Sequence, residues 1–304
     1  MTQPIAALLA IALAPTLAHA QADAPPPNDG QRYVGVGAQG DSQHNREVLS
    51  TLSLPVGRNA WVQASVGQAR SDAAAGNRRP GIVAGAVGLA GRNVQLTVNA
   101  SHRADGSAYR QTDVGSSLDW KQDGNVVGLD VTHRRSRASG NVAPSGGGAP
   151  VPTTARLAGS GVGVHGTLQA TGHVSLYGST LRNHYKSTTS TTTLAAPAPG
   201  GGLLGGSPLL ARSLLGGTSV VNRDEVALDS TTQVGATYRW TQVAVSGEYT
   251  TGKVHDGGGA MHAVDIKAAI DVAPGWRVTP GIGRGTGDQG GHATFASLAA
   301  TYGW

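Results

Sequence analysis

The sequence has 304 residues, of which 46 are glycine, one is phenylalanine and none is cysteine. Charged residues make up 13%, the net charge is +5, and apolar residues make up 39%. Soluble enzymes of this length carry more charge and more bulky apolar residues, so this class is disfavoured. The regular recurrence of Val, Leu and Ala disfavours a disordered chain, and collagen is excluded because the glycines lack its three-residue period. This balance suits a structure with lipid on one face and water on the other.

The first twenty residues have the features of a secretory signal peptide. Residues 5–18 read IAALLAIALAPTLA, which is too short to span a bilayer, and residues 18–20 form an A-x-A cleavage pattern. The basic residue that usually precedes such a stretch is missing. We expect residues 1–20 to be removed on export and residues 21–31 to form a Pro-rich periplasmic segment. Without cysteine, the chain has neither a lipid-modified N-terminal Cys nor a disulfide.

From Arg32 onward, apolar residues recur with a period of two. Val94, Leu96 and Val98, for example, alternate with polar side chains. This alternation indicates strands that have one apolar and one polar face. It predicts 14 strands, with 12 as the alternative count, at residues 32–40, 46–54, 60–69, 80–89, 93–103, 112–121, 125–135, 154–165, 172–184, 228–239, 242–252, 261–272, 276–285 and 293–304.

The connections between these segments alternate between short and long. The short class comprises residues 54–59, 90–93, 122–125, 170–172, 240–241 and 273–275, and the long class includes residues 70–79, 104–111, 136–152 and 186–224. Short turns on one side and long loops on the other are typical of outer-membrane barrels of bacteria. We therefore expect an all-β fold over residues 32–304, a transmembrane antiparallel up-and-down β-barrel with both termini on the periplasmic, short-turn side.

Aromatic residues support this topology. All five tryptophans fall at the periplasmic ends of predicted strands: Trp61, Trp120, Trp240, Trp276 and Trp304. Tryptophan favours the membrane interface because its ring is amphipathic, so the five are expected to form an interface girdle. Four share parity with the apolar face, whereas Trp61 does not, which points to a bulge or a shifted register there. Tyr109, Tyr185 and Tyr249 fall near the opposite end, where a second girdle belongs.

The final residues, ATFASLAATYGW, place Leu298, Ala300, Tyr302 and Trp304 on one face and end on an aromatic residue. This segment resembles the C-terminal strand of bacterial outer-membrane β-barrel proteins, although phenylalanine is the usual last residue there. The resemblance implies a porin-like outer-membrane protein whose last strand is recognised by the barrel-assembly machinery. It indicates a class of protein and no particular family.

The polar face of the strands is the first candidate for function. Its small residues are expected to leave room for water, as at Gly35, Gly67, Gly115, Gly128, Gly235 and Gly281. The charged residues assigned to the lumen are Asp119, Lys121, Asp130, Arg134, Arg156, Arg239, Glu248, Asp265, Lys267, Asp271 and Arg277. Both signs of charge are present, so strong ion selectivity does not follow. These side chains either line an open channel or pair with one another and occlude the lumen.

The long outer connections are the second candidate. Residues 186–224 contain three pairs of leucine and are either a gate or binding segment or a flexible low-complexity loop. Basic residues expected on the outer side are Arg70, Arg78, Arg79, Arg103, Arg110, Arg135, Arg137, Arg182, Lys186, Arg212 and Arg223. There they would meet the phosphates of lipopolysaccharide, since arginine binds phosphate in a bidentate manner. Basic residues interleaved with aromatics are missing, so no nucleic-acid partner is expected.

These observations favour a porin-like channel in the bacterial outer membrane for passive diffusion of small hydrophilic solutes. The alternative is a non-channel surface barrel that acts as an adhesin or as a structural or assembly partner for envelope polymers. Enzyme activity is not expected. A hydrolase at the outer rim would draw on His255, His262 and His292, but their spacing fixes no catalytic or metal geometry. No cofactor and no metal are expected.

Overall fold

The computed structural model describes residues 32–42, 45–70, 80–106, 109–142, 151–190, 228–255, 259–287 and 292–304. Residues 1–31, with the expected signal peptide, and most of the 186–224 connection lie outside these ranges. Within them the chain forms β1 (Tyr33–Asp41), β2 (Arg46–Val56), β3 (Ala60–Arg70), β4 (Gly81–Ala90), β5 (Val94–Asp105), β6 (Tyr109–Gln122), β7 (Asn125–Val142), β8 (Val151–Gln169), β9 (Val174–Ser190), β10 (Leu228–Arg239), β11 (Val243–Val254), β12 (Ala260–Ala273), β13 (Trp276–Gly287) and β14 (His292–Gly303). The expected number of strands, 14, is confirmed.

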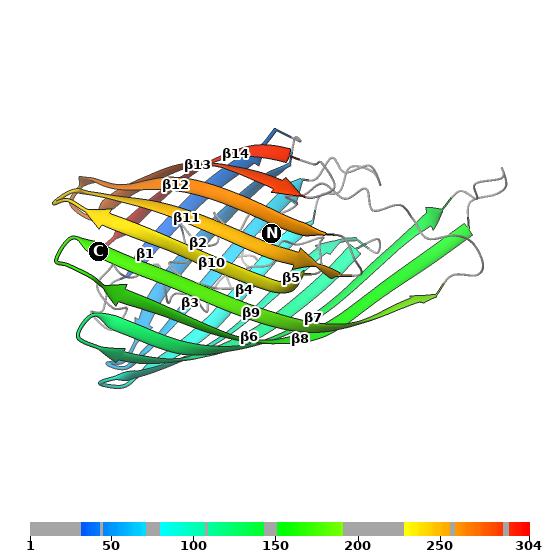
Figure 1. Ribbon diagram of the computed structural model, residues 1–304, viewed down its shortest axis with the longest axis horizontal. Helices are drawn as coiled ribbons and strands as arrows, with labels where there is room; N and C mark the ends of the chain where they lie inside the picture. The colour runs from blue at the N-terminus through cyan, green and yellow to red at the C-terminus, as the bar shows by residue number, and fades with distance from the viewer. Residues whose placement is uncertain are drawn as a thin grey trace, which may run out of the picture.

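The strands form one closed antiparallel barrel in which each strand pairs with its neighbours in the chain (Figure 1). Closure joins the first strand to the last, with Tyr33 opposite Gly303, and the Trp304 amide donates to the Arg32 carbonyl at 3.0 Å. Because hydrocarbon offers no hydrogen bonds, only a closed sheet satisfies its backbone in a membrane. In the described residues, no helix has the length and apolar character needed to cross a bilayer.

The two ends of the barrel differ. One end carries the tight turns, such as the one between β6 and β7, where Asp123 and Gly124 both have positive φ, at 51° and 79°. Two such residues form the hairpin turn whose twist matches the flanking strands. At the other end β7, β8 and β9, which have 18, 19 and 17 residues, run beyond the remaining strands (Figure 1).

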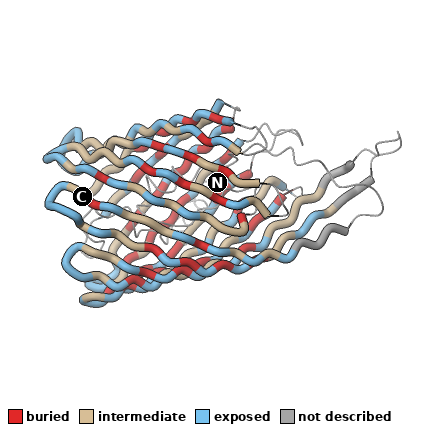
Figure 2. The backbone as a smooth tube through the Cα atoms, viewed as in Figure 1, coloured by how far each residue is buried: buried red, intermediate tan, exposed pale blue. Residues whose placement is uncertain are grey.

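Residues along each strand alternate between exposed and more buried positions, as Figure 2 shows. The outward positions carry exposed Val, Leu and Ile, such as Val127 at 67% and Val162 at 64% exposure. Polar side chains such as Gln95, Thr97 and Asp119 occupy the inward positions and are buried. The expected faces are therefore present: an apolar outer surface suited to lipid and a polar inner wall.

Candidate functional site

At some glycines of the inner wall, the space that a side chain would occupy is filled by the side chain of the residue directly opposite on the next strand. Gly128 lies opposite His165, and a Cβ added there would come 2.2 Å from the His165 Nε2 atom. Gly235 lies opposite Tyr177 in the same way, with a Tyr177 ring carbon 2.3 Å away. The expectation that these glycines leave room for water is wrong at such positions, because they admit neighbouring side chains.

Trp61 also packs on a glycine of the opposite strand. It therefore faces the lumen, and its assignment to the interface girdle is wrong. Its ring packs over Gly88, which lies opposite on β4, and an added Cβ at Gly88 would come 2.0 Å from the ring. Trp61 is 1% exposed, on the inward face of β3. The register is continuous here, so the parity of Trp61 reflects its inward direction and no bulge is needed. Its indole nitrogen has no hydrogen-bond partner in the described part of the chain.

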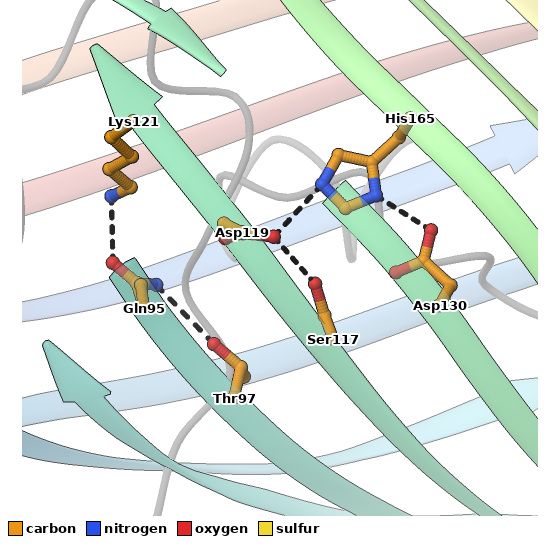
Figure 3. A network of polar contacts seen from close by, with 7 residues as sticks. All are labelled: Gln95, Thr97, Ser117, Asp119, Lys121, Asp130 and His165. Atoms are coloured by element: carbon orange, nitrogen blue, oxygen red, sulfur yellow. Dashed lines mark hydrogen bonds and ion pairs between the residues drawn. The ribbon is translucent and has the colours of Figure 1, made fainter. Parts of the chain in front are cut away.

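A buried histidine joins two carboxylates on the wall formed by β6 to β8, a few residues from the short-turn end (Figure 3). His165 Nε2 lies 3.0 Å from Asp119 Oδ1, and His165 Nδ1 lies 2.7 Å from Asp130 Oδ2. The Ser117 hydroxyl donates to the same Asp119 oxygen at 2.8 Å. Carboxylates accept hydrogen bonds, so a ring with both nitrogens on carboxylates satisfies both contacts only when it carries two protons. The cluster then alternates negative, positive and negative charge.

Lys121 and two residues of β5 form a second set of hydrogen bonds beside this cluster. Its ammonium group donates to Gln95 Oε1 at 2.7 Å, and the Gln95 amide donates to the Thr97 hydroxyl at 3.3 Å (Figure 3). Gln95 and Thr97 are buried. Alternate residues of β5 and β6 therefore supply hydrogen-bond donors and acceptors to the lumen.

A second set of ion pairs lies toward the long-connection end. Arg103 pairs with Glu47 at 3.6 Å, and Arg134 Nε donates to Asp113 Oδ1 at 2.7 Å. The Gln111 amide donates to the other Asp113 oxygen at 2.7 Å. All five side chains face inward. Arg103 was expected on the outer rim, but its parity places it in the wall, where Glu47 balances its charge.

The next part of the wall, β9 to β11, contains a third group, centred on Glu248. The Tyr177 hydroxyl donates to Glu248 Oε2 at 3.0 Å, and the Gln233 amide donates to Glu248 Oε1. On β12, Lys267 pairs with Asp265 at 3.3 Å. The wall thus carries carboxylates and cations on nearly every side of the lumen.

Near the short-turn end, the mouth of the barrel carries the exposed ion pair of Asp271 with Arg277. Arg277 Nε donates to Asp271 Oδ1 at 2.7 Å, and a second guanidinium nitrogen donates to Oδ2 at 3.2 Å. Arg239 shares this end of the wall on β10. This mouth is charged and accessible to water.

The structure places ten of the eleven charged lumen candidates on the inward face. Five are buried, namely Asp119, Asp130, Arg134, Glu248 and Asp265. Lys121, Arg239, Lys267 and Arg277 are half-buried, and Asp271 is exposed at the mouth. The prediction is wrong for Arg156, which has the same parity as the exposed Val162 and Val164 and faces outward on β8. It lies near the far end of this long strand, where apolar alternation no longer marks the lipid face.

Several wall residues were not expected from the sequence. His165, Glu47 and Asp113 are among the charged or ionisable ones, and Gln63 is a fully buried amide without a partner in the described residues. His165 shares parity with Gly161 and Gly163, so strand alternation alone would have assigned it to the lumen. Its two carboxylate partners depend on the register of β6, β7 and β8, which the sequence pattern does not specify.

The other four tryptophans lie at the short-turn end with their side chains outward. Trp120, Trp240, Trp276 and Trp304 are 48–56% exposed. The Tyr302 ring lies 4.9 Å from that of Trp276 and 6.0 Å from that of Trp304, centre to centre. Of the tyrosines expected in the second girdle, Tyr249 faces outward, whereas Tyr109 and Tyr185 face the lumen.

The three rim histidines do not form one site. His262 faces outward with its Nδ1 2.7 Å from the Tyr249 hydroxyl, and Thr286 separates it from His292 in the same row. His255 Nδ1 lies 2.6 Å from Asp229 Oδ1. Across the described ranges, no group of three or more acidic or histidine side chains is arranged to hold a metal ion.

Comparison with known proteins identifies the fold. No family model matches the chain, and no curated protein sequence matches it. Among solved structures, the "CymD monoaromatic hydrocarbon channel" is similar, with a TM-score of 0.55 at 8% identity over 90% of this chain and 88% of that one. A Pseudomonas aeruginosa FadL homologue also has a TM-score of 0.55, at 10% identity over 90% of each chain. These likenesses show the fold: the chain is a closed up-and-down β-barrel of 14 strands whose apolar outer face suits a lipid bilayer, the architecture of bacterial outer-membrane barrels.

Proposed function

We propose that the protein is a channel through which small hydrophilic solutes diffuse passively across the outer membrane. The observation that carries the proposal is the polar inner wall, which holds ion pairs from Glu47 and Arg103 near one end to Asp271 and Arg277 at the other. Barrels of 8 strands are filled by side chains, whereas those of 16–18 leave an aqueous channel. With 14 strands, this barrel falls between these limits.

Two features of the wall support a hydrophilic solute. The buried amide of Gln63 and the indole nitrogen of Trp61 have no hydrogen-bond partner among the described residues. Native proteins rarely leave such groups unpaired, so a side-chain movement that exposes them to water or to a solute in the lumen would form hydrogen bonds. The alternation of acidic and basic groups provides contacts for solutes of either charge and for neutral polar molecules.

The burial of the wall indicates a restricted passage. Glu47, Gln95 and Asp119 all face the lumen and are at most 3% exposed. Side chains that line a wide water-filled pore would be more exposed. We therefore expect a single-channel conductance below that of barrels with 16–18 strands, which leave an aqueous channel. We also expect the current to switch between closed and open levels.

Recording from purified protein in planar bilayers tests the channel. We expect discrete conductance steps, with neutral polymers that fit the lumen reducing the current and larger ones leaving it unchanged. Protein unfolded by heat before reconstitution is the control. The absence of steps at all voltages and pH values would exclude the channel.

A surface role without transport is the second candidate. The extension of β7, β8 and β9 beyond the other strands favours it, because these strands reach past the height of the barrel (Figure 1). Such a barrel would serve as an adhesin or as a structural or assembly partner for envelope polymers. Deletion of residues 187–222 separates the two roles. A gate would alter conductance on deletion, whereas an adhesive segment would alter surface binding and leave conductance unchanged.

We also propose that the protein is not an enzyme. The described rim histidines are held apart by the strand register, and His262 is bonded to a tyrosine on the lipid-facing side. Assays with lipid and peptide substrates are expected to show no turnover. Turnover that disappears when His255, His262 and His292 are replaced by alanine would refute this.

The last strand is proposed to be the signal for the barrel-assembly machinery. Leu298 and Trp304 are exposed on its outward face, and Ala300 and Tyr302 lie between them in the same row. Trp304→Ala is expected to lower the amount of folded barrel in the outer membrane. Refolding of this variant into detergent should match the wild type, because the change affects recognition by the machinery.

A further inference from the structure

A dense group of cations lies on the outward face of β6 to β9, near the long-connection end. We call this group the basic face; it consists of Arg110, Arg135, Arg137, Arg156, Arg182 and Lys186. Five of the six side chains are exposed, and Arg137 is half-buried. Arg156 belongs here because it faces outward.

The strand register places three of these arginines side by side. Arg137 on β7 lies directly opposite Arg110 on β6 and directly opposite Arg156 on β8. Opposite residues on a sheet have Cβ atoms about 4.5–5.5 Å apart, and like charges in such pairs destabilise the sheet. In the next row Arg135 and Lys186 are separated only by Ala158. The three arginines therefore form a row of positive charges that repel one another.

No acidic side chain compensates this charge in the described parts of these strands. The aspartates of β5, β6 and β7 have inward parity, and β8 and β9 have no acidic residue in their sequences. None of the six cations forms an ion pair among the described residues, and the buried Nε of Arg137 has no hydrogen-bond partner there. The basic face therefore has unused donors and an unbalanced positive charge.

The basic face begins where the apolar surface ends. On β7 the exposed residues Val127, Leu129 and Val131 are followed on the same face by His133, Arg135 and Arg137. A tilted strand needs about 9–11 residues to cross the hydrocarbon, and β7 has 18. The arginines consequently lie at the level of the lipid headgroups on the long-connection side.

We propose that the basic face binds the phosphate groups of a glycolipid in the outer leaflet, the bisphosphorylated lipid that anchors lipopolysaccharide. The ligand must be anionic, because every charged side chain of the basic face is a cation, and it must carry acyl chains, because the apolar belt continues directly below. Adjacent guanidinium groups bind phosphate oxygens in bidentate pairs, and this neutralises the repulsion within the row. The lipid is held on the outside of the barrel, so this site is independent of the lumen and of the channel function.

Binding of purified bisphosphorylated lipid A to the folded barrel in detergent micelles tests the proposal. The variant Arg137→Gln with Arg156→Gln removes two charges from the row and is expected to weaken binding at least tenfold. The matched control is Lys253→Gln with Arg284→Gln, which removes two isolated outward cations on β11 and β13, opposite Ala260 and Val264. This control should bind within twofold of the wild type.

A second comparison varies the lipid and keeps the protein unchanged. Lipid A without phosphates should bind the wild type as weakly as the intact lipid binds the Arg→Gln variant, and inorganic phosphate at the same concentration should not compete. Equal binding by all variants, an equal loss in the control, or competition by free phosphate would overturn the proposal. Arg137→Lys with Arg156→Lys keeps the charge and is expected to retain binding better than the glutamine variant. It also provides a folded comparison if the glutamine variant does not refold.

Discussion

Replacement of Gly128 by alanine is predicted to destabilise the barrel by displacing His165 from its two carboxylates. The new Cβ would lie 2.2 Å from Nε2 and 2.3 Å from Cε1 of His165, and 2.6 Å from Oδ1 of Asp119. Non-bonded carbon atoms rest at about 3.5–4.0 Å, so the ring must move by roughly 1 Å. This movement breaks the contact between His165 Nε2 and Asp119 Oδ1, which is now 3.0 Å.

The size of the effect combines three contributions. Loss of a hydrogen bond to a charged group costs about 1.5–3 kcal/mol, and overpacking of a filled interior costs about 1–3 kcal/mol. Replacing glycine by alanine within a strand offsets about 0.5–1 kcal/mol through lower backbone entropy. The expected net loss is about 2–5 kcal/mol of the free energy of unfolding.

Reversible urea unfolding in detergent micelles, followed by tryptophan fluorescence, measures this loss. Gly247→Ala is the matched control, because no atom lies within 4 Å of a Cβ added at Gly247, and its stability should equal or exceed that of the wild type. In a His165→Ala background, Gly128→Ala should have a smaller effect, since the ring that makes the two shortest contacts is gone and only Asp119 Oδ1 must shift. A Gly128→Ala variant as stable as Gly247→Ala, or a loss that is undiminished without His165, would refute the packing of the ring on the glycine.

Three further predictions follow from the inner wall. In single-tryptophan variants, brominated lipids should leave the fluorescence of Trp61 unquenched while quenching the four outward tryptophans, and Trp61→Ala should cost about 3–5 kcal/mol because the ring is fully buried. Quenching of Trp61 equal to the others would contradict its inward position. His165→Gln should cost about 3–5 kcal/mol in the same urea assay, because two buried carboxylates lose the cation between them, and asparagine at both carboxylate positions should restore most of it. No recovery would mean that charge balance is not the cause. Arg239→Gln with Arg277→Gln removes positive charge from the mouth and should shift the reversal potential of the channel toward cation selectivity in a salt gradient, and an unchanged potential would place the conducting path elsewhere.

The parity of residues along each strand predicted most of the wall before any tertiary information. Asp119, Asp130 and Glu248 were assigned to the lumen because they alternate with apolar residues, and the structure places all three inward. Parity also placed Trp61 away from the apolar face, although its position at the strand end suggested the girdle. Its parity correctly indicated an inward side chain, and its assignment to the girdle by its position at the strand end was wrong.

The sequence by itself determined the local features of this barrel: the strands, the alternation of short and long connections, and which face each residue takes near the membrane. These follow from period-two alternation and from turn residues, which act over a few positions. Only the tertiary structure decided which side chains meet, because partners such as Gly128 and His165 are distant in the chain and are joined by strand register. The same register sets Arg156 beside Arg137 on the outside and His165 between Asp119 and Asp130 on the inside. A barrel closes its hydrogen bonds between strands, so its contacts depend on a relation between distant segments that no single segment encodes.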